Sequence, residues 1–270
     1  MKSRYNAVFT ALTAAALFGA ATPLAKALLG SVSPFMLAGL FYLGSGLGLG
    51  IGIVWRAFRS RGLQSGTDHR ISKSELPWLI GAIATGGVAG PAFLMLGLAS
   101  TPAATSSLLL NLEGVLTAVI AWVVFRENVD VQVFLGMAAI VAGGVILSWH
   151  PGQVGVPVGA LLIVGACMCW AIDNNLTQKV SAGDPVQTAM LKGMVAGSIN
   201  TTIAVFLGAS WPSAPRVTAA LIVGFLSYGV SLVLFVISLR QLGTARTGAY
   251  FSTAPFVGAL LSLLIFREQP

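Results

Sequence analysis

Long apolar runs separated by short polar stretches fill the chain from end to end. Each run is uncharged or nearly so, and Gly, Pro, Ser or charged residues bound it. An α-helix of about 20 apolar residues crosses a hydrocarbon core of about 30 Å. The pattern predicts nine membrane-spanning helices, at 7–29, 34–55, 76–99, 103–125, 131–149, 158–180, 186–209, 217–239 and 246–266.

Composition agrees with this pattern. Hydrophobic residues make up 56% of the 270 residues, charged residues only 9%, and the mean hydropathy is +0.87. A soluble domain carries roughly 25% charged residues, so an ordinary soluble protein is excluded. The net charge of +7 is scattered between apolar runs and forms no basic face. We therefore expect membrane lipids as partners and no nucleic acid.

The positions of the cations predict the orientation. Short cytoplasmic loops carry an excess of Lys and Arg, and the loop from Arg56 to Lys73 is the most basic here. We expect an integral membrane protein, in a bacterial inner membrane, with a cytoplasmic N-terminus. The cytoplasmic cations are then Lys2, Arg4, Arg56, Arg59, Arg61, Arg70, Lys73, Arg126, Lys179, Arg240 and Arg246, against Arg216 and Arg267 outside.

The chain also matches itself. A displacement of 141 residues places Phe125–Glu127 on Phe266–Glu268, so the fourth and ninth spans end in the same tripeptide. A second match, near 151 residues, places Pro34 on Pro185. Equivalent spans are five apart, and because five is odd the two halves must cross the membrane in opposite senses. This pattern predicts an inverted repeat, which gives one central site two alternating accesses.

These paired segments, together with the stretch from Thr101 to Gly144, resemble the EamA-type permeases of the drug/metabolite transporter superfamily. The resemblance covers essentially the whole chain. It implies an all-α membrane protein of ten helices, in two inverted sets of five around a central cavity. The repeats would be 1–149 and 150–270, and the second stops one helix short. Either a tenth helix has been cut away or this version lacks it; such a helix is peripheral in the family.

Ionisable side chains inside a bilayer cost several kcal/mol unless they are paired or face water. Glu113 lies near the middle of the fourth span and shares a helical face with Ser106 and Thr117. It is either a carboxylate that binds cations or accepts a proton, or a strut neutralised by Lys26 or Lys192.

In the sixth span, Asp173, Asn174 and Asn175 are consecutive, with Trp170 and Thr177 on the face of the aspartate. Three polar side chains in a row cannot all face lipid. We expect Asp173 and Asn174 to line a cavity or gate, and interhelical hydrogen bonds are the alternative.

Further candidates are weaker. Lys26 follows Thr22 and Pro23 in the first span, and either binds an anionic substrate group or reaches the outer interface. Lys192 lies near the inner end of its helix and is less favoured. Asn111 in the fourth span and Tyr250 in the ninth are softer candidates.

Neither the two glycine series nor the Cys and His residues indicate a binding or metal site. The glycines from Gly44 to Gly52, and Gly86 with Gly90, have the spacing of close helix packing. Cys167 and Cys169 point about 200° apart on a helix, and both histidines fall in predicted loops. We expect no metal and no cofactor.

Together these features favour a secondary-active transporter of small organic metabolites such as amino acids or drug-like solutes. The family favours export, and a proton is a candidate coupling ion. No paired catalytic groups and no nucleotide-binding loop occur within the spans, so an enzyme is not expected. The alternatives are a channel-like facilitator or a non-transporting membrane scaffold, with an intramembrane enzyme less favoured. A homodimer is a candidate assembly of the chain.

Overall fold

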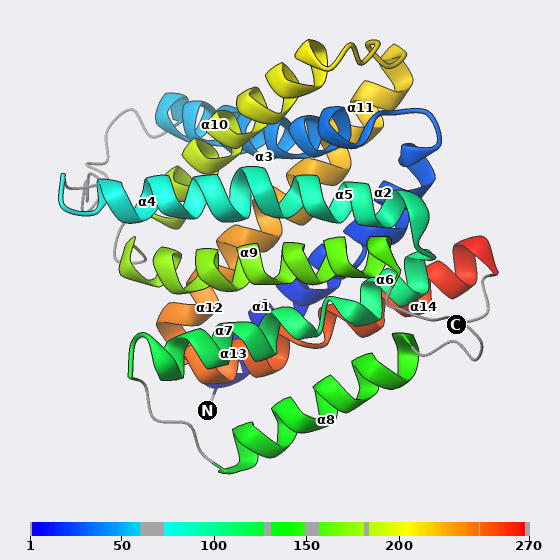
Figure 1. The fold of residues 1–270 in the computed structure, drawn as a ribbon. Helices are drawn as coiled ribbons and strands as arrows, with labels where there is room; N and C mark the ends of the chain where they lie inside the picture. The colour runs from blue at the N-terminus through cyan, green and yellow to red at the C-terminus, as the bar shows by residue number, and fades with distance from the viewer. Residues whose placement is uncertain are drawn as a thin grey trace.

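The computed structural model describes residues 2–59, 73–126, 131–148, 157–180, 184–242 and 244–267, and these contain helices and no strand (Figure 1). The first half comprises α1 (Lys2–Gly19), α2 (Ala21–Leu29), α3 (Pro34–Arg59), α4 (Leu76–Ala82), the π-helix η1 (Ile83–Ala89), α5 (Gly90–Ser100), α6 (Ala103–Leu109), α7 (Leu112–Val123) and α8 (Val131–Ser148). The second half comprises α9 (Val158–Val180), α10 (Pro185–Phe206), α11 (Ala214–Gly224), the π-helix η2 (Phe225–Val230), α12 (Ser231–Leu242), α13 (Thr244–Phe251) and α14 (Ala254–Phe266).

Seven of the described helical stretches are long and apolar enough to cross a membrane, and two shorter apolar helices accompany them. Large apolar side chains such as Phe9, Trp55 and Phe206 are exposed on the outside of the bundle, as a lipid-facing surface requires. The all-helical membrane fold is therefore confirmed, whereas the count of nine spans and the orientation stay predictions. In Figure 1, α1 begins at one end of the bundle and α14 ends at the opposite end.

Five predicted spans are continuous apolar runs in the sequence but interrupted helices in the structure. The first breaks at Ala20, between α1 and α2. The third and eighth each contain a π-helical segment, and the first residues of these segments, Ile83 and Phe225, lie 142 residues apart. The fourth and ninth each bend between two helices, at 110–111 and at 252–253, again 142 residues apart. The two halves thus share local backbone features at nearly the spacing of the sequence match.

The bend in the fourth span corrects one expectation. The face shared by Ser106, Glu113 and Thr117 assumed an unbroken helix, but Ser106 belongs to α6 and the other two to α7. The Asn111 amide donates to the carbonyl of Leu108 at 3.0 Å, where the backbone N–H of Asn111 also donates at 3.1 Å. This side-chain bond supports a tighter turn, so the helix breaks there.

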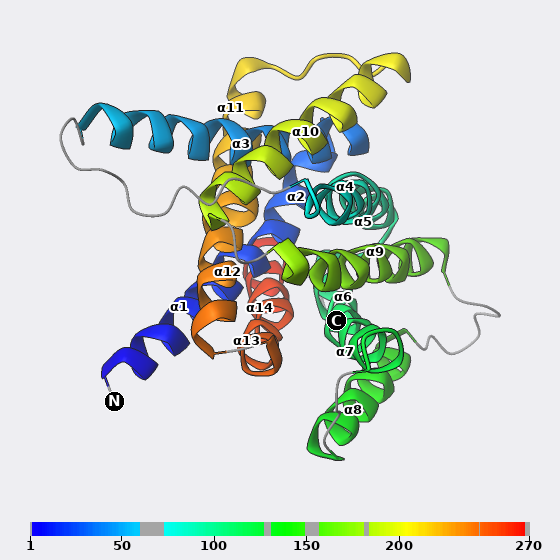
Figure 2. The same ribbon diagram turned by 90° about the vertical axis from the view of Figure 1, so that its left-hand side faces the viewer.

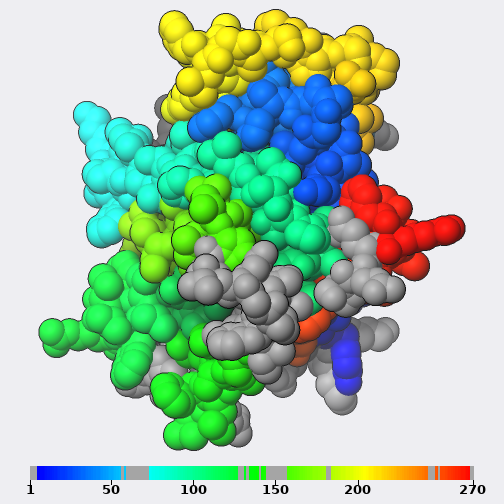
Figure 3. Space-filling view, turned by 45° about the vertical axis from the view of Figure 1, so that its right-hand side comes forward, coloured from blue at the N-terminus to red at the C-terminus, as the bar shows by residue number. Residues whose placement is uncertain are grey.

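The glycine series of α3 lets this helix pack on two sides. Residues two apart on a helix point about 200° apart, so alternate glycines face opposite neighbours. A Cβ added at Gly46 would lie 2.6 Å from the backbone nitrogen of Met194 in α10, and one at Gly48 would strike Phe225 in η2. Figures 2 and 3 show α3 lying directly beside α10, and α11 also packs against α3. Close packing thus accounts for Gly44, Gly46 and Gly48, whereas a Cβ at Gly52 would meet nothing within 4 Å.

Candidate substrate cavity

A small cavity of about 60 Å³ lies where the two halves meet. It draws lining residues from α1, α3 and α7 of the first half and from α9, α10, η2, α12 and α13 of the second. Its polar lining is Glu113, Asp173, Asn174, Lys192, Ser227 and Ser231. Its apolar and aromatic lining is Phe18, Tyr42, Trp170, Tyr228, Leu232, Phe235 and Phe251.

An ion pair forms one wall. Lys192 of α10 donates to Asp173 Oδ2 of α9, and the Thr177 hydroxyl donates to Oδ1 at 2.9 Å. Both charged residues are buried, with 5% and 3% of Asp173 and Lys192 exposed. A buried charge is stable only with such a partner, so the pair fixes α9 against α10.

Glu113 faces this wall from the first turn of α7. The Asn174 amide donates to Glu113 Oε1 at 2.8 Å and to the Thr117 hydroxyl at 3.3 Å. The other carboxylate oxygen, Oε2, accepts no hydrogen bond from any described residue. Neither lysine named beforehand as a partner forms an ion pair with Glu113, so its strut role is not the arrangement seen here.

The three consecutive polar residues of α9 make different contacts. Asp173 and Asn174 line the cavity as expected from the sequence. Asn175 instead donates to the backbone carbonyls of Thr117 at 3.2 Å and Ala171 at 2.8 Å. Cavity lining and interhelical bonding are therefore both present, on neighbouring residues.

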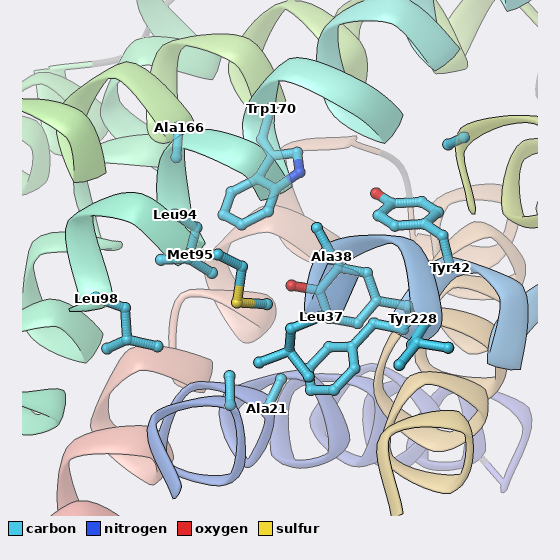
Figure 4. Close-up of a cluster of buried hydrophobic side chains, with 14 of the residues drawn as sticks. Ala21, Leu37, Ala38, Tyr42, Leu94, Met95, Leu98, Ala166, Trp170 and Tyr228 are labelled. Carbon is cyan, nitrogen blue, oxygen red and sulfur yellow. The ribbon is translucent and has the colours of Figure 1, made fainter. Parts of the chain in front are cut away.

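The π-helix η1 supports this wall from behind. The Gly86 carbonyl accepts the Tyr42 hydroxyl at 2.6 Å and the Trp170 indole N–H at 3.0 Å. A Cβ added at Gly86 would overlap the Asp173 carboxylate. Figure 4 shows the rings of Tyr42, Trp170 and Tyr228 gathered at one side of the buried hydrophobic cluster. Gly86 thus holds two rings and leaves room for the ion pair.

Aromatic rings form the rest of the cavity wall. The Phe18 ring centroid lies 5.8 Å from those of Trp170 and Tyr228 and 5.3 Å from that of Phe251. Tyr42 and Tyr228 lie 5.1 Å apart. The Tyr228 hydroxyl is buried and has no hydrogen-bond partner in the described structure. A buried hydroxyl without a partner costs about 1–3 kcal/mol, so this group would gain from any ligand or water that reaches it.

Several residues predicted for the site lie away from it. Lys26 donates to the carbonyls of Leu98 at 2.7 Å and Thr101 at 2.9 Å, which ties the first span to the end of α5. Thr22 is buried outside the cavity lining, and Tyr250 is half-buried beside Phe251, which does line it.

The remaining predicted residues support the site indirectly. Ser106 is buried and its hydroxyl donates at 2.7 Å to the carbonyl of Pro102, the residue that precedes its own helix. Asn111 holds the bend before Glu113, while Thr117 and Thr177 bind the lining residues Asn174 and Asp173.

Sequence reasoning missed most of the aromatic lining and undervalued Lys192. Lys192 was judged by its distance from the helix end, yet it faces inward between the close-packing residues of α10. Its charge inside an apolar run was the available signal. Tyr42 and Tyr228 carried no comparable signal, because aromatic residues in spans usually serve packing.

This fold and cavity define a polytopic helical membrane protein with a small polar chamber among its helices. The chain matches the EamA-like transporter family over residues 6–149 and 157–270, and it belongs to that family. The protein is therefore a transporter of the EamA-like family. The names of the family and of its relatives point to transport and not to catalysis.

Two curated relatives share this description. An uncharacterized transporter of Methanothermobacter thermautotrophicus is 27% identical over 272 residues, covering 95% of this chain and 78% of the relative. The uncharacterized transporter YyaM of Bacillus subtilis is 22% identical over 186 residues, covering 64% of this chain and 60% of the relative. A solved structure, titled only "Crystal structure of protein", superposes with a TM-score of 0.70 at 19% identity, covering 98% of this chain and 91% of that one. That likeness concerns the fold.

Proposed function

We propose that this protein is a secondary-active exporter of small organic metabolites that works by alternating access, with its N-terminus in the cytoplasm of a bacterial cell. One observation carries the proposal: a cavity lined by both halves holds a carboxylate oxygen and a buried hydroxyl that no described residue binds. Polar groups inside a membrane bundle are typical of a substrate pathway. The substrate enters this cavity from one side and leaves it on the other.

The paired backbone features of the two halves support alternating access. The π-helices η1 and η2 and the two bends recur 142 residues apart. Arg126 and Arg267, which follow the fourth and ninth spans, both adopt left-handed backbone conformations, with φ of 55° and 52°. Two halves built alike and inserted oppositely can exchange conformations around a fixed site. We include the inverted repeat in the proposal on this basis.

Transport by purified protein in liposomes tests the proposal. Vesicles are loaded with an unlabelled mixture of amino acids and aromatic amines, and uptake of each labelled compound is followed. A carrier gives saturable uptake and counterflow of at least one compound, whereas a channel gives neither. Absence of both over the whole panel, with correctly folded protein, contradicts the proposal.

Glu113→Gln is the informative variant. Its amide oxygen still accepts the hydrogen bond from Asn174, but the negative charge is gone. We therefore expect the counterflow rate to fall at least about tenfold relative to the unaltered protein. Asp184→Asn is the matched control, because Asp184 caps α10 by accepting the Val186 N–H at 2.8 Å, outside the cavity. The control amide retains that bond, so its counterflow stays close to that of the unaltered protein.

A further inference from the structure

We propose that the substrate is a small organic cation, an ammonium compound with an aromatic or apolar body and no carboxylate. This inference rests on the proposed function and names its substrate class. It comes from the balance of charge in the cavity and from the rings around it.

The charge balance leaves one carboxylate without an opposite charge. Among the described lining residues, Asp173 and Lys192 neutralise each other in a direct ion pair. Glu113 has only the neutral amide of Asn174. With Glu113 ionised, the cavity as a whole carries one negative charge, which a monovalent cation would neutralise.

The position of the two lysines disfavours an amino acid. A zwitterion needs a cationic anchor for its carboxylate, but Lys26 binds backbone carbonyls at the end of α5 and does not line the cavity. Lys192 is already engaged by Asp173. A substrate carboxylate would thus compete with a buried carboxylate for the same ammonium group. Lys26, Glu113 and Asp173 therefore do not form one lining that would bind both charges of a zwitterion.

The rings supply the second half of the recognition. Phe18 contacts Trp170, Tyr228 and Phe251, and all four rings line the same cavity as Glu113. A cation over an aromatic face gains about 0.5–2 kcal/mol, and more when water is excluded. The Tyr228 hydroxyl, which is buried and unpartnered, can accept an ammonium hydrogen. An ammonium group therefore finds one carboxylate oxygen, one hydroxyl and several rings.

Three probes of one skeleton test the inference. Phenethylammonium, L-phenylalanine and 2-phenylethanol share a phenyl ring and two carbons; they differ in carrying a cation, a zwitterion and no charge. Calorimetric titration of the full chain in detergent measures their dissociation constants. We expect the dissociation constant of phenethylammonium to be at least about tenfold lower than that of either other compound. Equal or tighter binding of L-phenylalanine, or no measurable binding of the amine, overturns the inference.

The same titration on two variants locates the preference. In Glu113→Gln, phenethylammonium and 2-phenylethanol should bind within about threefold of each other, because the charge that separates them is removed. Asp184→Asn should keep the preference of the unaltered protein. A preference that survives in Glu113→Gln overturns the assignment of Glu113 as the cation partner. The test on the unaltered protein stands even if a variant fails to fold.

Binding and transport together separate the two proposals. If phenethylammonium binds preferentially but no compound shows counterflow, the ligand class stands and the transport proposal fails. If L-phenylalanine shows counterflow and the amine neither binds nor moves, transport stands and the ligand class fails.

Discussion

The fourth and ninth spans bend at equivalent points but carry different chemistry beyond the bend. In the fourth span the Asn111 amide donates to the Leu108 carbonyl; in the ninth the Thr253 hydroxyl donates to the Tyr250 carbonyl at 2.7 Å. Two residues further on, the fourth span has Glu113 and the ninth has Pro255. Both halves therefore have the same bend in the helix, but only the first half has a charged residue just after the bend.

The two π-helices differ in the same way. Gly86 of η1 lies 142 residues before Tyr228 of η2, so equivalent positions hold a glycine and a tyrosine. Gly86 makes room for the Asp173 carboxylate, whereas the Tyr228 side chain enters the cavity itself. The two halves thus share backbone features, whereas the side chains at equivalent positions differ. The chemistry of the cavity lining is therefore different in the two halves.

The largest effect should come from breaking the ion pair. Asp173→Asn leaves the Lys192 ammonium buried without its charge partner, which costs about 3–5 kcal/mol of stability. The double variant Asp173→Leu/Lys192→Met removes both charges and should recover most of that loss. Thermal unfolding in detergent, followed by tryptophan fluorescence, measures both. A double variant no more stable than the single one contradicts this account of the wall.

A smaller loss of stability should distinguish a glycine of η1 from a glycine of η2. Gly86→Ala pushes a methyl group into the Asp173 carboxylate and should cost about 1–3 kcal/mol. At Gly229 a Cβ would lie 3.2 Å from Cα and Oγ of Ser45, and the gain in helix propensity offsets most of that crowding. The melting temperature should therefore fall clearly for Gly86→Ala and little for Gly229→Ala. Equal losses would show that η1 has no special role.

The smallest effect concerns the bends. Asn111→Ala and Thr253→Ala each remove one side-chain bond to a backbone carbonyl, worth about 0.5–1.5 kcal/mol. We expect similar losses of melting temperature, because the two bonds play equivalent parts. Only Asn111→Ala should also weaken phenethylammonium binding, since Glu113 follows that bend. Equal binding losses in both variants would contradict the different chemistry of the two halves.

The positions of the spans were predictable from the sequence because burial in lipid demands unbroken apolar length. The predicted span 158–180 coincides with α9, and Pro34 and Pro185 mark the starts of α3 and α10.

The π-helices were not predictable, because bonds such as that of Tyr42 to the Gly86 carbonyl join distant parts of the chain. Such bonds leave no periodic trace in the sequence. The bends carry local bonds of Asn111 and Thr253, but one polar residue inside a span does not distinguish a bend from a cavity-lining position.

For the cavity, charge was the informative signal. Glu113 and Asp173 stand out in apolar runs because an isolated charge is costly there, and both line the cavity. Lys26 stands out equally, but carbonyl groups satisfy it elsewhere. Which charge pairs with which is decided by helix packing, and the aromatic residues have no polarity to mark them. The sequence thus indicated the charges and left their partners undetermined.

The one uncompensated carboxylate of the lining also has an electrical consequence. Moving a unit charge through the membrane potential is worth about 2.3 kcal/mol per 100 mV. If the cavity carries an organic cation outward on Glu113, as proposed, and returns with a proton on the same carboxylate, its net charge is the same in both directions. Such an exchange is electroneutral. The chemical gradients of the two ions then drive it, and the voltage across the membrane neither helps nor hinders.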